Sequence, residues 1–116
     1  MSTQSNNHDN RPIFINRFIV PGQAKEEFVE RLHINQDYIK NLPGFVEDRA
    51  YQRTDEDGNL VCITVAVWED EESLSNAKEA VKEEYQRQGF DPAEFFQQND
   101  ITAERGIFTK ITSTLK

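Results

Sequence analysis

The sequence predicts an α+β fold in which strands and helices follow one another in the order β-α-β-β-α-β, with an antiparallel sheet. Two segments, 12–20 and 60–68, are apolar on both faces of a strand, as expected for the central strands of a sheet. The segments that follow them, 23–42 and 71–88, carry apolar residues at helical spacing. A length of 116 residues suits one domain.

The predicted first strand, 12–20, has one polar interruption on each face. Successive side chains of a strand point to opposite sides. Phe14, Asn16 and Phe18 therefore share one face, whereas Arg17 lies on the other. An amide and a guanidinium in the middle of a doubly apolar strand each require a separate explanation.

The helix predicted over 23–42 lies between two breaks. It follows Pro21 and Gly22 and ends at Pro43 and Gly44, because proline disfavours helical geometry in the residue before it and glycine permits a sharp reversal. The strand 45–54 is largely polar, which is typical of a sheet edge. The letters DEDGN that follow predict a hairpin turn.

The second helix is predicted to begin after Asp70 as its N-cap and to end near Gln88. A short helical turn is expected from Pro92, and a last strand over 106–111. This order is the ferredoxin-like arrangement, in which the first and third strands are central and both helices cover one face. The other face would expose apolar side chains, which implies a partner. We therefore predict a homodimer whose sheets pack face to face.

The composition excludes several classes of partner. The chain has 21 acidic and 13 basic residues and a net charge of −8, which argues against nucleic acid and anionic membranes. No apolar run approaches the roughly 20 residues of a transmembrane helix. The single Cys62 and the absence of a signal-like N-terminus predict a cytoplasmic protein. Residues 1–11 are expected to be a disordered tail, and 12–116 the domain.

The chain resembles the antibiotic biosynthesis monooxygenase (ABM) family of dimeric α+β barrels over about residues 12–111. The resemblance is carried by INRFIVPG on the first strand, the first helix with Phe28 and Leu32, LPGF at 42–45, and VAVWEDEESL at 65–74. It implies a cofactor-independent monooxygenase that combines a small electron-rich aromatic or quinol with molecular oxygen. A deprotonated phenol or enol can react with oxygen itself, so the protein need only bind it, help deprotonate it and exclude water.

The resemblance also implies which residues form the site. Trp68 matches a tryptophan that lines the substrate pocket of polyketide-oxidising members, and Asn16 matches an asparagine that points into the pocket of haem-degrading members. On this basis the face of Asn16 turns to the helices and that of Arg17 to the second chain. The expected substrate-binding residues are Phe14, Asn16, Phe18, Thr64, Trp68 and Tyr85, and the catalytic candidates are Asn16, Trp68 and His33 as a general base.

Each candidate also has a structural alternative. Trp68 could be a core aromatic residue, Asn16 a structural amide, and His33 an exposed helix residue. Two histidines and one cysteine at these positions make no metal site, so no metal and no cofactor are expected.

Differences from the family keep other functions open. Polyketide-oxidising members have an asparagine and a tyrosine where this chain has Thr64 and Leu74. The chain could therefore be a non-catalytic, dimeric small-molecule-binding or structural protein of the same fold. Haem degradation is a third possibility, but it requires a histidine and a second tryptophan on the second helix, and 75–88 contains neither. An open cavity lined by Asn16 and Trp68 would favour binding over a structural role.

Overall fold

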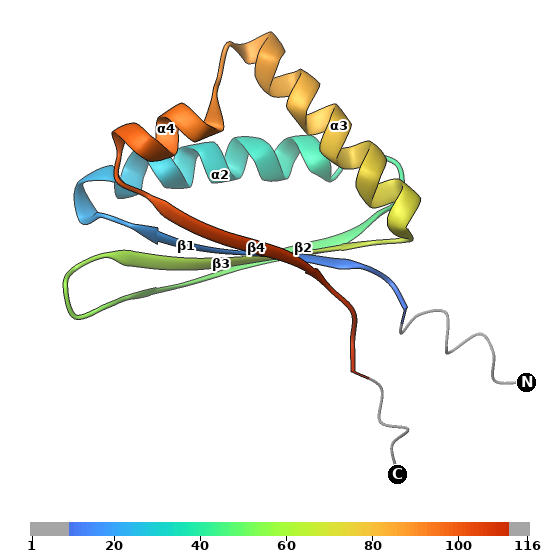
Figure 1. Ribbon diagram of the computed structural model, residues 1–116, viewed down its shortest axis with the longest axis horizontal. Coiled ribbons are helices and arrows are strands. Elements are labelled where there is room, and N and C mark those ends of the chain that lie inside the picture. The colour runs from blue at the N-terminus through green and yellow to red at the C-terminus, as the bar shows by residue number, and fades with distance from the viewer. Residues whose placement is uncertain (1–9, 112–116) are drawn as a thin grey trace, which may run out of the picture.

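The computed structural model describes residues 10–111, and it confirms the predicted α+β order together with the short helix expected from Pro92 (Figure 1). The predicted tail lies almost wholly outside the described residues. The elements are β1 (Ile13–Val20), the 3-10 turn η1 (Gly22–Ala24), α2 (Lys25–Ile39), β2 (Phe45–Thr54), β3 (Leu60–Trp68), α3 (Glu71–Gln88), α4 (Pro92–Gln98) and β4 (Thr102–Phe108).

The sheet is antiparallel in the order β2-β3-β1-β4, so β1 and β3 are central as predicted. Figure 1 shows α2, α3 and α4 on one side of the sheet and no helix on the other. Asn16 of β1 lies opposite Thr64 of β3 and opposite Arg105 of β4. These three residues form one row across the sheet, and because paired residues share a face, the whole row turns to the helices.

The ends of α3 are fixed by local sequence. The side chain of Asp70 accepts a hydrogen bond of 2.8 Å from the backbone N–H of Ser73, which satisfies one of the unpaired donors of the first turn. Gly89 ends the helix with a φ of 70°, a left-handed conformation that glycine adopts without the steric cost of a Cβ. The direction of α3 over the sheet is therefore set at both ends.

The last strand begins at Thr102 and ends at Phe108, earlier than the predicted 106–111. The chain leaves α4 through Asp100, whose φ is 56°, and the N–H of Ile101 donates to Phe96 O at 2.9 Å. Ile101 is buried in the core. This anchor starts the strand sooner than its apolar residues suggest, and it brings Arg105 into the sheet.

The core consists of two apolar clusters between sheet and helices. The larger cluster contains Phe18, Val20, Ala24, Phe28, Leu60, Cys62 and Ile101. The smaller one contains Ile39, Trp68, Leu74 and Ala77. Among the described helices, none has the length and apolar character that a membrane crossing requires.

The opposite face of the sheet carries apolar side chains without cover, and we call it the bare face. It holds Ile13, Ile15, Arg17 and Ile19 of β1 and the residues paired with them. Tyr51 is 55% exposed, Ile63 36% and Phe108 52%. Apart from Arg17 and its ion-pair partner Glu104, the two inner strands and these residues form an apolar surface of a kind that is unusual on a monomer.

Candidate functional site

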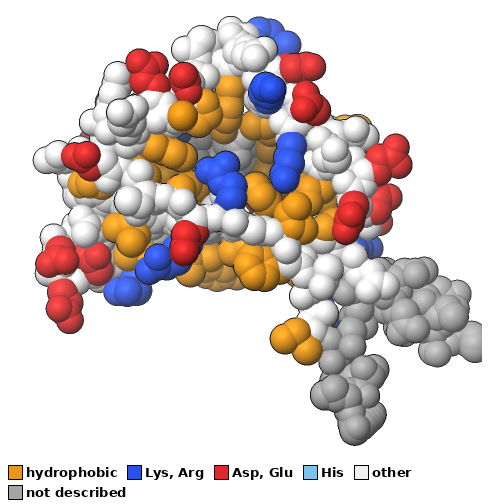
Figure 2. All heavy atoms as spheres, viewed as in Figure 1, with side chains coloured by type: hydrophobic (Ala, Val, Ile, Leu, Met, Phe, Trp, Pro, Cys, Tyr) orange, Lys and Arg blue, Asp and Glu red, His pale blue; other side chains and the backbone are white. Residues whose placement is uncertain are grey.

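A cavity of about 750 Å³ lies between the helices and the sheet. Figure 2 shows a hollow with hydrophobic side chains inside it and Lys and Arg side chains around it. Its apolar wall comes from both core clusters, with Phe18 from the larger and Ile39, Trp68 and Leu74 from the smaller. The volume falls within the roughly 300–1,000 Å³ of small-molecule sites.

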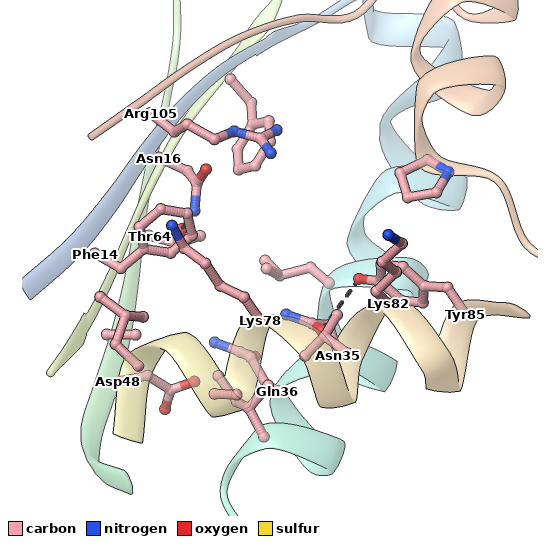
Figure 3. Close-up of a pocket in the computed structure, with 18 of the residues that line it drawn as sticks. Phe14, Asn16, Asn35, Gln36, Asp48, Thr64, Lys78, Lys82, Tyr85 and Arg105 are labelled. Carbon is pink, nitrogen blue, oxygen red and sulfur yellow. Dashed lines mark hydrogen bonds between the residues drawn. The ribbon is translucent and has the colours of Figure 1, made fainter. Parts of the chain in front are cut away.

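Asn16 stands in the floor of the cavity and binds its neighbour across the sheet. Its Nδ2 donates to Thr64 Oγ1 at 3.3 Å, and both side chains are half-buried. Among the described residues, no other hydrogen bond involves the Asn16 side chain, so its amide oxygen is available to a ligand. Figure 3 shows the amide pointing from the sheet towards the cavity.

Trp68 belongs to the core and to the cavity wall together. It is 2% exposed and packs edge-to-face on Phe45, with ring centroids 5.6 Å apart. Its neighbours Ile39, Leu74 and Ala77 line the same cavity. The core alternative and the pocket hypothesis for Trp68 are thus compatible.

Asp48 is the acidic group of the floor. It extends from β2, where it lies opposite Ala66, and it is half-buried. Burial raises the pKa of its carboxyl above the ordinary value, while Lys40 and the backbone N–H of Asp48 act in the opposite direction. A carboxylate with a raised pKa in a cavity is a candidate proton acceptor.

Tyr85 supplies a hydroxyl from the helix side. Its OH donates to Asn35 Oδ1 at 3.1 Å, the bond drawn as a dashed line in Figure 3. Burial raises the pKa of the Tyr85 phenol, against the smaller opposing effect of Arg31 and Arg105. Tyr85 therefore keeps its proton at neutral pH and holds the Asn35 amide in place.

All six expected binding residues line the cavity, namely Phe14, Asn16, Phe18, Thr64, Trp68 and Tyr85. His33 does not, because it lies exposed on α2. Sequence reasoning missed the other polar lining residues, namely Asn35, Gln36, Asp48, Lys78, Lys82, Gln86, Asp91 and Arg105. Strand pairing could have indicated Asp48, which lies in the same row as Phe14 through Ala66.

The described residues do not offer a metal centre. Within residues 10–111, no group of three His, Cys, Asp or Glu side chains could hold an ion. The described lining residues also include neither histidine nor cysteine. Cys62 is buried in the larger core cluster, and burial raises the pKa of its thiol.

The model of the antibiotic biosynthesis monooxygenase family matches residues 13–88. The solved structure of SnoaB, a cofactor-independent oxygenase from Streptomyces nogalater, is 27% identical with a TM-score of 0.65, over 92% of this chain and 99% of that one. A candidate monooxygenase from Shewanella loihica PV-4 is 21% identical, with a TM-score of 0.67 over 90% of this chain and 97% of that one.

A candidate antibiotic biosynthesis monooxygenase from Nitrosomonas europaea is 15% identical, with a TM-score of 0.65 over 91% of this chain and 95% of that one. The Shewanella and Nitrosomonas structures bear on the fold alone. Among curated protein sequences, none matches the chain significantly.

Proposed function

The chain belongs to the antibiotic biosynthesis monooxygenase family, and we propose that it is a cofactor-independent monooxygenase acting on a small electron-rich aromatic or quinol. The observation that carries the proposal is the open cavity in which Asn16 and Thr64 form a polar floor beside Trp68. An open cavity favours binding of a small molecule over a purely structural role. The likeness to SnoaB supports oxygen chemistry without a cofactor.

The cavity suggests how the substrate is held and activated. The ring would lie against Phe14, Phe18 and Trp68, and the Asn16 amide would hold a phenol or enol oxygen. Asp48 would accept the proton that activates the substrate, because its pKa is raised towards the range of a useful base. His33 has no part in this proposal, since it lies outside the cavity.

The proposed reaction needs no external reductant. Asp48 takes the proton of the phenol or enol, and the resulting anion, whose charge is shared with a ring carbon that carries hydrogen, passes one electron to O₂. The radical pair then forms a C–O bond to give a hydroperoxide. Loss of water leaves a carbonyl, so one oxygen atom enters the product and the other leaves as water. The substrate supplies all the electrons, and exclusion of bulk water protects the intermediates.

Oxygen uptake with a panel of hydroquinones, anthrones and catechols tests this function. We expect uptake by the wild type with at least one member of the panel. Asp48→Asn should lower kcat by about 100-fold, and Asn16→Ala should lower kcat/KM by about tenfold. Trp68→Phe tests whether the tryptophan in the cavity wall contributes to activity. His33→Gln serves as the control, because His33 lies outside the cavity.

The differences at Thr64 and Leu74 support a second candidate function. Where polyketide-oxidising members have an asparagine and a tyrosine, this chain has the shorter hydroxyl side chain of Thr64 and the apolar Leu74, so the cavity could bind a small molecule without transforming it. Tight binding of a panel member together with no oxygen uptake above the uncatalysed rate would favour this non-catalytic function. Uptake that is insensitive to Asp48→Asn and Asn16→Ala would contradict the proposed site.

We also infer that the protein is a homodimer joined through the bare face. The exposed Tyr51, Ile63 and Phe108 support this inference, because burial of apolar surface drives association. Obligate interfaces of this kind typically bury more than about 2,000 Å² in total. Sedimentation velocity at low micromolar concentration should show a dimer, and a stable monomer would contradict the inference.

We propose a cytoplasmic location on the evidence of Cys62. It is the only cysteine of the chain, and it is a free thiol in the core. A lone reduced cysteine suits a reducing compartment. Fractionation of the source cells would test this, and recovery from an extracytoplasmic fraction would contradict it.

A further inference from the structure

Three basic side chains line the cavity, although the chain as a whole has a net charge of −8. Lys78 and Lys82 lie one helical turn apart on α3, and Arg105 comes from β4. They approach the same space from the helix layer and from the sheet. Figure 3 shows Lys78 reaching from α3 towards the sheet and Arg105 pointing into the cavity.

Arg105 is placed by the sheet register. It lies opposite Asn16, which in turn lies opposite Thr64, so guanidinium, amide and hydroxyl succeed one another in one row. All three line the cavity. A row with several hydrogen-bond donors beside a fixed positive charge is suited to hold an oxyanion.

None of these three cations is neutralised by an ion pair within the described residues. The ion pairs there involve Arg11, Arg17, Lys40, Arg49 and Arg87. The Nζ of Lys78 lies 5.1 Å from the centre of the Phe14 ring. A contact with a ring face leaves the N–H groups of the ammonium free to donate to a ligand.

The two acidic lining residues, Asp48 and Asp91, do not pair with these cations. Asp91 is the N-cap of α4, and its carboxylate accepts from the backbone N–H groups of Ala93 and Glu94 at 3.1 and 3.3 Å. Asp48 lies on β2, the edge strand opposite to the β4 strand of Arg105. The cavity therefore has an acidic side at β2 and a basic side between β4 and α3.

We propose that the substrate is an aromatic carboxylate, whose carboxylate is bound by Arg105 with Lys78 and Lys82. This inference rests on the proposed function, because it names the substrate class of the same cavity. The ring lies against the apolar wall with its reacting position towards Asp48. The cations pair with the substrate carboxylate, which lowers the cost of bringing an anion into an acidic protein. Neutral quinols and anthrones are poorer ligands.

Binding without oxygen separates this inference from the proposed chemistry. We would titrate 1,4-dihydroxy-2-naphthoate and its methyl ester into the protein under nitrogen. Isothermal titration calorimetry would give Kd. Quenching of Trp68, the single tryptophan of the chain and part of the cavity wall, would report occupancy. We expect the acid to bind at least about tenfold tighter than the ester, as for one charge-assisted pair.

The variants assign this preference to the cations. Arg105→Gln and the double variant Lys78→Gln with Lys82→Gln should each weaken the acid by about tenfold, and should change the ester by less than about twofold. Lys25→Gln is the matched control, since it removes the same charge from an exposed position outside the cavity. Arg105, Lys78 and Lys82 are exposed, so their loss leaves the core intact.

Each outcome has a defined meaning. Equal binding of acid and ester by the wild type, or an equal effect of Lys25→Gln and Arg105→Gln, overturns the carboxylate inference while the cavity remains a binding site. Preferential binding of the acid with no oxygen uptake overturns the oxygenase proposal, while the assignment of the three cations to the ligand carboxylate stands. Failure of the acid to bind to folded wild-type protein overturns the carboxylate inference, whereas the oxygenase proposal is overturned only by the absence of oxygen uptake with the panel.

Discussion

The two faces of the sheet use the same four strands, but within residues 10–111 the helices cover only one of them (Figure 1). On the helix face, Phe18 and Val20 are buried and the Asn16–Thr64 pair borders a cavity. On the bare face, Ile63 and Tyr51 remain open to solvent. The helix face combines a buried core with a cavity. The bare face is an apolar surface that none of the described helices covers (Figure 1). The comparison predicts that the proposed ligand binding and the inferred dimer respond to different substitutions, one residue apart on β1.

The largest effect is expected on the helix face, where Trp68 is nearly inaccessible. Trp68→Ala should lower the free energy of unfolding by about 3–5 kcal/mol, because it removes a large buried aromatic and leaves a void beside Phe45. Urea unfolding followed by circular dichroism would measure it. A loss below about 1 kcal/mol would mean that the helix face is not the core of the molecule.

The next effect concerns the bare face. Ile63→Lys should weaken association by at least about 100-fold, because it places a second positive charge opposite Arg17 in the inferred interface. Ile34→Lys is a matched control, since both isoleucines are 36% exposed but Ile34 lies on α2. Sedimentation equilibrium would compare them. Equal dissociation by the two variants would remove the bare face from the assembly.

Two adjacent residues of β1 sharpen the comparison further. Asn16→Leu should weaken binding of a cavity ligand by about tenfold and leave assembly unchanged, because Asn16 faces the helices. Arg17→Leu should leave ligand binding unchanged and weaken assembly, because Arg17 lies on the bare face near Glu104, with 3.8 Å between Nη1 and Oε1. Calorimetry and sedimentation on both variants would check this, and exchanged phenotypes would invert the assignment of faces.

The smallest effect is a dependence of stability on pH. Burial raises the pKa of Asp48, so the folded state holds its proton to higher pH than the unfolded chain. Stability should therefore fall as pH rises from the ordinary carboxyl pKa through the raised one. Asp48→Asn removes this decline and should give a slightly higher Tm at pH 7.

Asp70 provides a control of opposite sign. The hydrogen bond from the Ser73 N–H lowers the pKa of Asp70, so its contribution is present at neutral pH and lost as pH falls. Asp70→Ala should thus lower Tm at pH 7 and have little effect at low pH. The same pH response in the Asp48 and Asp70 variants would contradict the assignment of Asp48 to a buried position.

The sequence predicted the strand order and the β1 residues that line the site, but it did not predict the charged lining residues. Alternation along β1 groups Phe14, Asn16 and Phe18, and two doubly apolar strands predict which strands are central. Arg105 was missed because the last strand was expected over 106–111, and its true start depends on the buried Ile101. That anchor is a tertiary contact with no local pattern.

Lys78 and Lys82 were missed for a different reason. On a helix, lysines that flank an apolar stripe usually mark the solvated edge. Only the space between α3 and the sheet turns that edge into the lining of a cavity. Because periodicity gives the direction of a side chain and not the distance to the next layer, the basic side of the site had to come from the structure.

Because the thiol of Cys62 is buried, a dye can be attached selectively to either face of the sheet through an introduced cysteine. It is 3% exposed, and burial raises the pKa of its thiol, so it forms little of the thiolate that maleimides attack. Since the chain has no other cysteine, a thiol introduced at Tyr51 or at Lys82 would be the one that a dye labels. A fluorophore at the first position would report on association, and one at the second on occupancy of the cavity, without first removing the native cysteine.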